Sequence, residues 1–238
     1  SAEFLVAATH QMKGADACMV NEDMAAIVYT DSGTNGYLLL VDVKSDKLHA
    51  YPIGFTGPFA FYTGSMELHT SVVKVTTDIL AIAYNDLSQA KIVFVDVSNV
   101  ASISVSSTPL AVPASTGNSG VRLLMKSATR MFVAYNVLSI SNGYVQEVNV
   151  NGVYNPVVNL DGATFVSGQC VFDSDSEARN PSMVAIESAG GSVNKLGIAY
   201  DEGGLTGKFV ALDTTSGNPG SYGGPYQLQF SAIPILEY

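Results

Sequence analysis

One stretch decides the fold: Leu80-Ala81-Ile82-Ala83-Tyr84-Asn85-Asp86, a short apolar run that ends in Tyr and is followed by polar turn residues. The same pattern occurs three more times along the chain. The other copies are Ala25-Ala26-Ile27-Val28-Tyr29 before Thr30-Asp31, Met131-Phe132-Val133-Ala134-Tyr135 before Asn136, and Leu196-Gly197-Ile198-Ala199-Tyr200 before Asp201-Glu202. Apolar runs this short and rich in β-branched residues predict strands. Their recurrence indicates a repeat fold.

A second apolar run follows each Tyr and ends in Asp or Asn. The separation from the Tyr to that Asp or Asn is 13, 12, 14 and 13 residues in the four copies. Another apolar stretch precedes each Tyr run, at 17–20, 71–75, 121–125 and 182–186. A Pro heads a further run in every copy, and these residues are Pro52, Pro109, Pro156 and Pro225. Because Pro cannot donate to a strand ladder, that run is expected at the outer edge of a four-stranded unit.

The predicted fold is all-β, a β-propeller of four four-stranded antiparallel blades in a single domain spanning 1–238. The repeat units are 16–58, 70–115, 120–160 and 181–230, and residues 1–15 and 231–238 are expected to close the ring. In this arrangement 4–8 take the linker position that 59–62 hold after the first copy. A fifth, degenerate blade in 157–181 stays open, as does a β-sandwich or a pair of small β-domains. Radial stacking of such units is the propeller solution to exposed sheet edges.

The repeated pattern of an apolar-Ala-Tyr-x-Asp run, Gly-Tyr, a Val-rich strand and a Pro resembles a loose class of propeller repeats. Such repeats occur in phage tail proteins and in large secreted or surface proteins of aquatic microbes. The resemblance covers most of the chain, but its motifs are short. It implies a propeller at a cell or virion surface and no particular activity. A four-blade ring is also geometrically similar to hemopexin-like domains, whose Trp signature is missing here because the chain has no Trp.

Composition limits the classes of function. Only 13% of the residues are charged, and the formal net charge is −10. Nucleic-acid binding is not expected, because it requires clustered Lys and Arg. No window reaches the ~18 apolar residues of a membrane span, so membrane insertion is not expected. Polarity carried by Ser, Thr, Asn and Gly is typical of an extracellular, cell-surface or virion protein.

The best local metal candidate is the acidic run at Asp173, Asp175 and Glu177. Alternate residues of an extended segment point the same way, so the three carboxylates could converge on calcium. The EF-hand pattern fails, because Ala178-Arg179 follow where a Gly is needed. A solvated acidic loop is the simpler interpretation.

Two repeated sets of residues allow both structural and functional interpretations. The tyrosines Tyr29, Tyr84, Tyr135 and Tyr200 could ring a ligand, but packing between blades with the hydroxyl bonded at the rim is favoured. Turn stabilisation is likewise favoured over a cation-binding ring for the strand-end acids. These acids are Asp31, Asp42, Asp86, Asp96, Asp201 and Asp213.

Other chemistry has weaker signals. Cys18 and Cys170 are disulfide candidates that would staple neighbouring copies one and four; two buried free thiols are the alternative. His10, His49 and His69 have no zinc-site spacing. No catalytic residue is identified, since Gly-x-Ser-x-Gly is absent and Gly190-Gly191-Ser192 lacks the context of a nucleophile elbow.

The sequence therefore favours a non-enzymatic surface module for binding or adhesion that recognises a glycan or a protein. Its ligand-binding residues stay unknown. A structural subunit that packs against copies of itself in a fibre, capsid or appendage is the first alternative. A propeller hydrolase resembling glycoside hydrolases and using acidic rim residues is the second.

Overall fold

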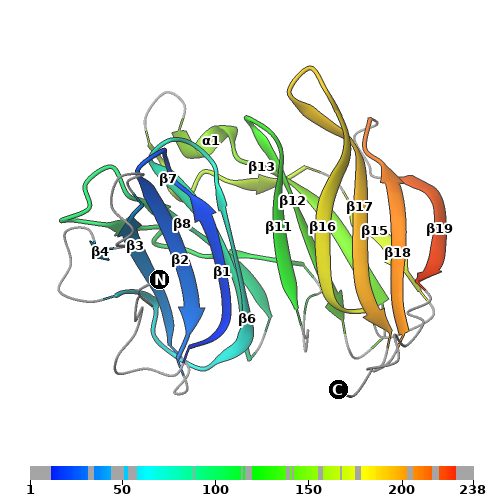
Figure 1. The fold of residues 1–238 in the computed structure, drawn as a ribbon, viewed down its shortest axis with the longest axis horizontal. Helices are drawn as coiled ribbons and strands as arrows, with labels where there is room; N and C mark the ends of the chain where they lie inside the picture. Colours follow the sequence, from blue (N-terminus) through cyan, green and yellow to red (C-terminus); the bar gives the residue numbers. More distant parts are fainter. Residues whose placement is uncertain are drawn as a thin grey trace, which may run out of the picture.

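The computed structural model describes residues 12–31, 35–43, 51–52, 58–87, 89–113, 115, 120–137, 140, 142–154, 158–166, 168–174, 178–202, 206–215 and 220–228. This part of the chain is almost entirely β-structure, grouped into four antiparallel sheets. The sheets form the blades of a four-bladed β-propeller (Figure 1). No helix in the described part is long and apolar enough to cross a membrane.

The blades follow one another in chain order. Blade one contains β1 (Lys13–Met19), β2 (Met24–Thr30), β3 (Gly36–Asp42), β4 (Tyr51–Pro52) and β5 (Phe59–Tyr62). Blade two contains β6 (Met66–Lys74), β7 (Ile79–Asp86), β8 (Ala90–Asp96), β9 (Ser104–Val105) and β10 (Leu110–Ala111). Blade three contains β11 (Val121–Ser127), β12 (Arg130–Val137), β13 (Asn142–Asn149), β14 (Thr164–Phe165) and β15 (Cys170–Asp173), with the short helix α1 (Asn151–Tyr154) after β13. Blade four contains β16 (Ala178–Ala189), β17 (Ser192–Glu202), β18 (Thr206–Asp213) and β19 (Gly220–Leu228).

The first strand of each blade lies innermost, and β1, β6, β11 and β16 contact one another in that order. The second strands carry the repeated tyrosines at one common register. Opposite them on the third strands lie Tyr37, Lys91, Tyr144 and Lys208. The predicted repeat is therefore confirmed residue by residue in its two central strands.

The outer strand is split into two short pieces in the first three blades. In blade one, β4 pairs with one end of β3 and β5 pairs with the other end. In the same way, β9 and β10 pair with β8, and β14 and β15 pair with β13. Residues 59–62, expected as a linker, are thus half of an outer strand. Within the stretch 157–181, a candidate fifth blade, β14 and β15 instead form the outer strand of blade three, and residues 178–181 begin β16 of blade four.

The predicted edge positions of the prolines are confirmed where they can be seen. Pro52 lies in β4, and Pro109 directly precedes β10. Pro225 lies in β19, where the pairing with β18 shifts register between the partners of Phe209 and Ala211. Pro156 lies outside the described residues. Because Pro donates no hydrogen bond, it is tolerated on these edges.

Neighbouring blades pack through two different faces of the second strand. The tyrosine face carries the Tyr and the residues two and four positions before it. The alanine face carries the residues one and three positions before the Tyr, and at least one of these two is Ala in every blade. Its members are Ala26 and Val28, Ala81 and Ala83, Phe132 and Ala134, and Gly197 and Ala199.

Three apolar clusters repeat one packing rule: the tyrosine face of a blade covers the alanine face of the blade before it. Blades one and two share the first cluster, blades two and three the second, and blades three and four the third. The buried residues Ile82, Val133 and Ile198, two positions before each Tyr, are all 0% exposed. Complementary sizes on the two faces explain why the repeat alternates Ala with large apolar residues.

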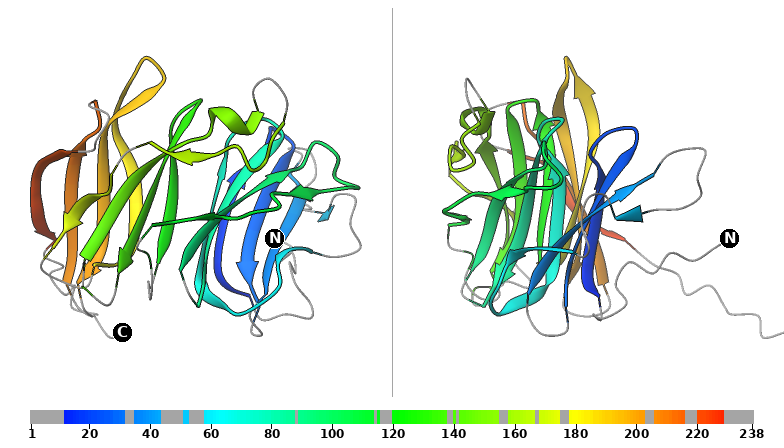
Figure 2. Two further views of the ribbon diagram at one scale, coloured as in Figure 1. Left: turned by 180° about the vertical axis from the view of Figure 1, so that it is seen from behind. Right: turned by 90° about the vertical axis from the view of Figure 1, so that its left-hand side faces the viewer.

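The fourth junction differs from the other three. No apolar cluster among the described residues joins blade four to blade one. Figure 1 and the rear view in Figure 2 show β3 and β18 at opposite ends of the long axis. The predicted closure of the ring by 1–15 and 231–238 falls mostly outside the described residues and stays a prediction.

Candidate functional site

The hairpin turns between first and second strands gather at one end of the propeller. They are residues 20–23, 75–78, 128–129 and 190–191. In blade four the turn is Gly190-Gly191, with φ of 59° and 78°. Two consecutive residues at positive φ are the requirement of a type I′ hairpin turn, which glycine meets without strain. The strands β16 and β17 have 12 and 11 residues, and their hairpin projects beyond its neighbours at the top of Figure 1.

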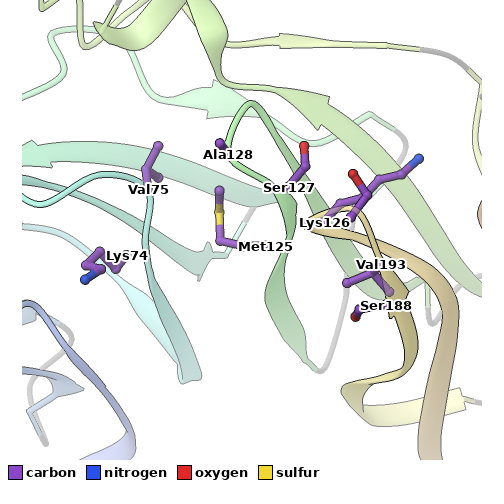
Figure 3. Close-up of a pocket in the computed structure, with 10 residues that line it drawn as sticks. Lys74, Val75, Met125, Lys126, Ser127, Ala128, Ser188 and Val193 are labelled. Carbon is purple, nitrogen blue, oxygen red and sulfur yellow. The ribbon is translucent and has the colours of Figure 1, made fainter.

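Three of these hairpins, from blades two, three and four, surround an open hollow of about 430 Å³ (Figure 3). Val75, Met125 and Val193 give it apolar walls, and Ala128 lies at the tip of the blade-three hairpin. Hydroxyl groups come from three serines along its margin. They are Ser127, Ser188 and Ser192. No aromatic or acidic side chain lines the hollow among the described residues.

Both lysines at the hollow are engaged by other parts of the protein. The Lys74 ammonium donates a 3.0 Å hydrogen bond to the backbone oxygen of Val20 in blade one. The Lys126 ammonium is 2.8 Å from Glu147 Oε2 and 5.3 Å from the centre of the Phe132 ring. Figure 3 shows the end of Lys126 directed away from Met125 and Val75. The hollow thus offers apolar walls and hydroxyl groups rather than a converging pair of cations.

Buried Glu147 explains why Lys126 turns away. Its side chain is 5% exposed, and Arg130 Nη1 lies 3.7 Å from its second carboxylate oxygen. A carboxylate buried in this way requires paired cations, because desolvation disfavours an isolated charge. The ion pair therefore holds the β11 side of the hollow in place.

The repeated tyrosines do not ring a ligand site. All four are buried, and burial raises the pKa of Tyr29, Tyr84 and Tyr135. The predicted packing between blades is confirmed for Tyr84, Tyr135 and Tyr200. Tyr29 instead packs within blade one and stacks on Tyr37. The ring of Tyr84 lies 4.8 Å from that of Tyr62 on blade one, and the ring of Tyr200 lies 5.2 Å from that of Phe172 on blade three.

The predicted hydroxyl bond at the rim is found at Tyr135. Its hydroxyl donates a 3.0 Å bond to the backbone oxygen of Pro113 in blade two, and Gln169 donates to the Tyr135 oxygen. The hydroxyls of Tyr29 and Tyr84 are buried with no hydrogen-bond partner in the described part of the chain. The tyrosines therefore contribute to packing, and they differ in the hydrogen bonding of their hydroxyls.

Four of the six strand-end acids make the turn contacts favoured from the sequence. Asp31 Oδ1 accepts a 2.9 Å bond from the Asn35 backbone N–H, and Asp86 Oδ1 does the same for Gln89. Similar bonds to backbone N–H groups two residues ahead are made by Asp96 and Asp213. Asp42 ends β3, and Asp201 pairs with Gly207 in the sheet of blade four. These contacts explain the recurrence of Asp after a strand.

The candidate calcium ligands lie only partly within the described residues. Asp173 ends β15 with its side chain buried, whereas Asp175 and Glu177 lie outside the described ranges. Within those ranges, no group of three or more His, Cys, Asp or Glu lies close enough together to hold a metal ion. The calcium site at 173–177 stays a prediction. His10 and His49 are also outside, and burial followed by the charge of Arg122 lowers the pKa of His69.

Both cysteines are free thiols, so the predicted Cys18–Cys170 disulfide is not formed. Cys18 lies in β1, opposite Ala26, on the innermost strand of blade one. Cys170 lies in β15, opposite Val145, on the outer edge of blade three instead of before the first strand of blade four. A disulfide requires the two Cα atoms to lie within about 7 Å of each other, which an inner and an outer strand of non-neighbouring blades do not provide. Burial raises the pKa of both thiols, that of Cys18 to about 11.

The hollow was not identified from the sequence. Its signal is the pair Gly190-Gly191, which marks a tight hairpin at the end of two long strands. The sequence gives no indication that the hairpins of three blades meet there. No protein-family model and no curated protein sequence matches the chain.

Proposed function

We propose that this protein is a non-enzymatic binding module that recognises a protein partner through the hollow between blades two, three and four. An apolar side chain from an exposed segment of the partner enters the hollow. The observation that carries the proposal is the position of an open, apolar-walled hollow at the end of the propeller where the inner hairpins converge. Its volume of about 430 Å³ is within the usual range of ligand sites, about 300–1,000 Å³.

The composition of the hollow favours a protein partner over a glycan. Aromatic rings are the usual platforms for a sugar face, and none lines this site among the described residues. Met125 instead offers a flexible, polarisable side chain that adapts to apolar groups of different shapes. The serine hydroxyls donate and accept hydrogen bonds, so they suit the backbone amides that flank an inserted side chain.

The hollow gives no support to the hydrolase alternative. Hydrolysis of a glycosidic bond uses two carboxyl groups about 5–9.5 Å apart. No Asp or Glu lines this hollow in the described part of the chain, and neighbouring Glu147 is held by Lys126 and Arg130. An extracellular or virion surface, as in the propeller repeats that the sequence resembles, is the proposed setting. The low charge content of 13% supports this setting.

A display library of random peptides and an array of neutral and acidic glycans, both tested on purified protein, distinguish the two ligand classes. We expect enrichment of peptides that share an apolar residue, together with a blank glycan array. Ala128→Arg and Ser188→Arg place a long side chain at the hollow from exposed positions, so they should fold and lose the selected peptides. Leu87→Arg is the matched control, since Leu87 is 67% exposed in the β7–β8 loop at the opposite end.

The outcomes separate clearly. Peptides that bind wild type and Leu87→Arg equally but bind Ala128→Arg at least about tenfold more weakly support the proposal, because truncated or blocked anchor sites typically lose that much. Glycan binding that the same variants abolish would reassign the hollow to a carbohydrate ligand. Peptides that bind all variants equally, or no enrichment at all, overturn the proposal.

A further inference from the structure

Acidic side chains occupy the hairpin turns of blades one and two, at the same end of the propeller as the hollow. Glu22 and Asp23 lie in the turn of blade one, and Asp78 lies in the turn of blade two. All three residues are exposed, and within the described part of the chain Asp23 and Asp78 form hydrogen bonds only through their backbone groups. None of the three carboxylates is bound to another described residue, so their charges are available to a partner.

Both turns lie beside the hollow. The turn of blade two begins at Val75, which lines the hollow, and ends at Asp78. The turn of blade one begins at Val20, whose backbone oxygen accepts a 3.0 Å bond from Lys74, another lining residue. Figure 3 shows Lys74 and Val75 on the side of the hollow opposite the blade-four hairpin. The acidic turns therefore border the hollow on the side of blades one and two.

Further negative charge comes from the ends of the third strands. Three of these strands end in Asp at the same end of the propeller, opposite residues near the start of the second strands. They are Asp42, Asp96 and Asp213. The described basic residues at this end are Lys74, Lys126, Arg130 and Lys195. Because Lys126 and Arg130 both lie beside Glu147, the surroundings of the hollow are acidic overall.

These acidic side chains are spread around the hollow and do not converge on one point. In the part of the chain that the structure describes, no group of three or more His, Cys, Asp or Glu is close enough together to hold a metal ion. Separated carboxylates instead complement cations that are themselves separated, such as the Lys and Arg side chains of an extended segment. Complementary charge across an interface speeds encounter and selects among partners.

We propose that the partner segment is basic: it inserts an apolar side chain into the hollow, and neighbouring Lys or Arg residues approach the acidic turns of blades one and two. This inference rests on the proposed function, because it assigns the charge of the partner that enters the same hollow. Of the two lysines that line the hollow, Lys126 is held by Glu147. The charge of Lys74 is therefore the main repulsion that a basic partner meets.

The proposal predicts how salt changes the kinetics of binding. Screening reduces the attraction between exposed charges, because the Debye length falls from about 30 Å at 0.01 M salt to about 3 Å at 1 M. The association rate of a basic segment should fall at least about tenfold between about 20 mM and about 500 mM NaCl, whereas dissociation of the inserted apolar side chain should change little. Lys74→Gln should speed association, because it removes the opposing charge.

Three pools of random peptides test the charge of the partner. The pools share a central position restricted to apolar residues and differ only in the flanking positions, which are Lys, Gln or Glu. Biolayer interferometry on immobilised protein at low salt gives the association rate of each pool. The Lys pool should bind fastest and the Glu pool slowest, at least about tenfold apart. Equal rates for the three pools overturn the proposal.

Two double variants with the same net charge provide the control. Glu22→Gln with Asp78→Asn removes two charges beside the hollow and changes the formal net charge by +2, from −10 to −8. Ser65→Lys with Leu87→Lys makes the same change at exposed positions of the opposite end. Binding of the Lys pool that slows at least about fivefold in the first variant and not in the second supports the proposal. Equal slowing in both is an effect of net charge alone and overturns it.

The Gln pool separates this inference from the proposed function, because it tests insertion without charge. If Ala128→Arg abolishes binding of the Gln pool but wild type shows no preference for Lys, the hollow binds an apolar side chain and only the basic partner is overturned. If the Lys pool binds wild type and Ala128→Arg equally, the hollow is not the binding site and both proposals are overturned.

Discussion

A glycine covered by an aromatic ring permits a quantitative test of how the blades pack. A Cβ added at Gly143 would lie 2.3 Å from Phe172 Cε2 and 2.8 Å from the Cβ of Ala178. Blade two has Ala90 at the same register, and there Val112 pairs directly with Ala90, whereas the pairing of β13 with β15 shifts register at Phe172. The Val112 backbone N–H donates a 2.9 Å bond to Ala90 O, and both residues are fully buried. Glycine with phenylalanine and alanine with valine are thus two solutions to one packing problem.

The expected energies follow from these contacts. Gly143→Ala forces the Phe172 ring to move by about 1 Å, and overpacking of this kind costs about 1–3 kcal/mol of unfolding free energy. Phe172→Val leaves a cavity over Gly143 and costs about 2–3 kcal/mol, below the range for Phe→Ala. The double variant reproduces the pair found in blade two. We expect it to lose only about 1–2 kcal/mol, so the two substitutions should be coupled favourably by at least about 1 kcal/mol.

Urea unfolding of wild type, both single variants and the double variant, followed by circular dichroism, gives the four free energies of the cycle. Equal m-values across the four proteins are the control that the unfolding transition is unchanged. Strictly additive losses would refute the reasoning, because the ring and the missing Cβ would then not compete for the same space. A stable Gly143→Ala variant would refute it as well.

The remaining predictions use the same denaturation assay or simple chemistry. Tyr135→Phe should lower the unfolding free energy by about 1 kcal/mol, because it removes a buried hydrogen-bonded hydroxyl. Tyr84→Phe should be neutral or stabilising, since the Tyr84 hydroxyl is buried with no partner among the described residues; equal losses in the two variants would contradict both. Glu147→Ala should cost about 3 kcal/mol, because Lys126 loses its buried carboxylate; a loss below about 1 kcal/mol would show that the pair is not structural. Burial raises the pKa of Cys18 from 9.0 to about 11, so folding stability should fall as the pH rises from about 9 through about 11. At pH 8 the native thiol should react with iodoacetamide at least about tenfold more slowly than in urea, and equal rates would contradict the burial.

The central strands were predictable because their signal is local. The alternation of large and small residues before each Tyr reports two buried faces, and the Asp or Asn after a strand reports a turn. Asp31 and Asp86 make the turn contacts that this pattern indicates. The register of the tyrosines follows directly from their spacing.

The outer strands were harder to predict, because short edge strands carry little periodic signal. β4, β9 and β14 have two residues each, too few to show alternation. Phe61 was expected to lie in a linker. The sequence does not distinguish an aromatic residue that covers a glycine from one in a linker. Its role becomes visible only through Gly36, where an added Cβ would lie 2.5 Å from the Phe61 ring.

The binding hollow and the position of Cys170 depend on contacts between distant repeats. Cys170 follows a long insertion after β13, and the sequence does not show whether this segment belongs to blade three or blade four. The hollow requires three hairpins to end at one level, which depends on strand length and bulges. The pairing of β16 with β17 shifts register at several positions, and no residue pattern in the sequence predicts these shifts.

The divided outer strands have a consequence for solubility. An exposed strand edge presents unpaired backbone groups that can template pairing with another chain, and short or proline-containing edges limit this hazard. The first three blades expose edge pieces of two to four residues, with Pro52 inside one of them and Pro109 directly before another. Blade four instead ends in β19, a continuous edge of nine residues whose pairing is interrupted near Pro225. Pro225 therefore limits edge-to-edge aggregation of blade four, as the divided outer strands do in the other three blades.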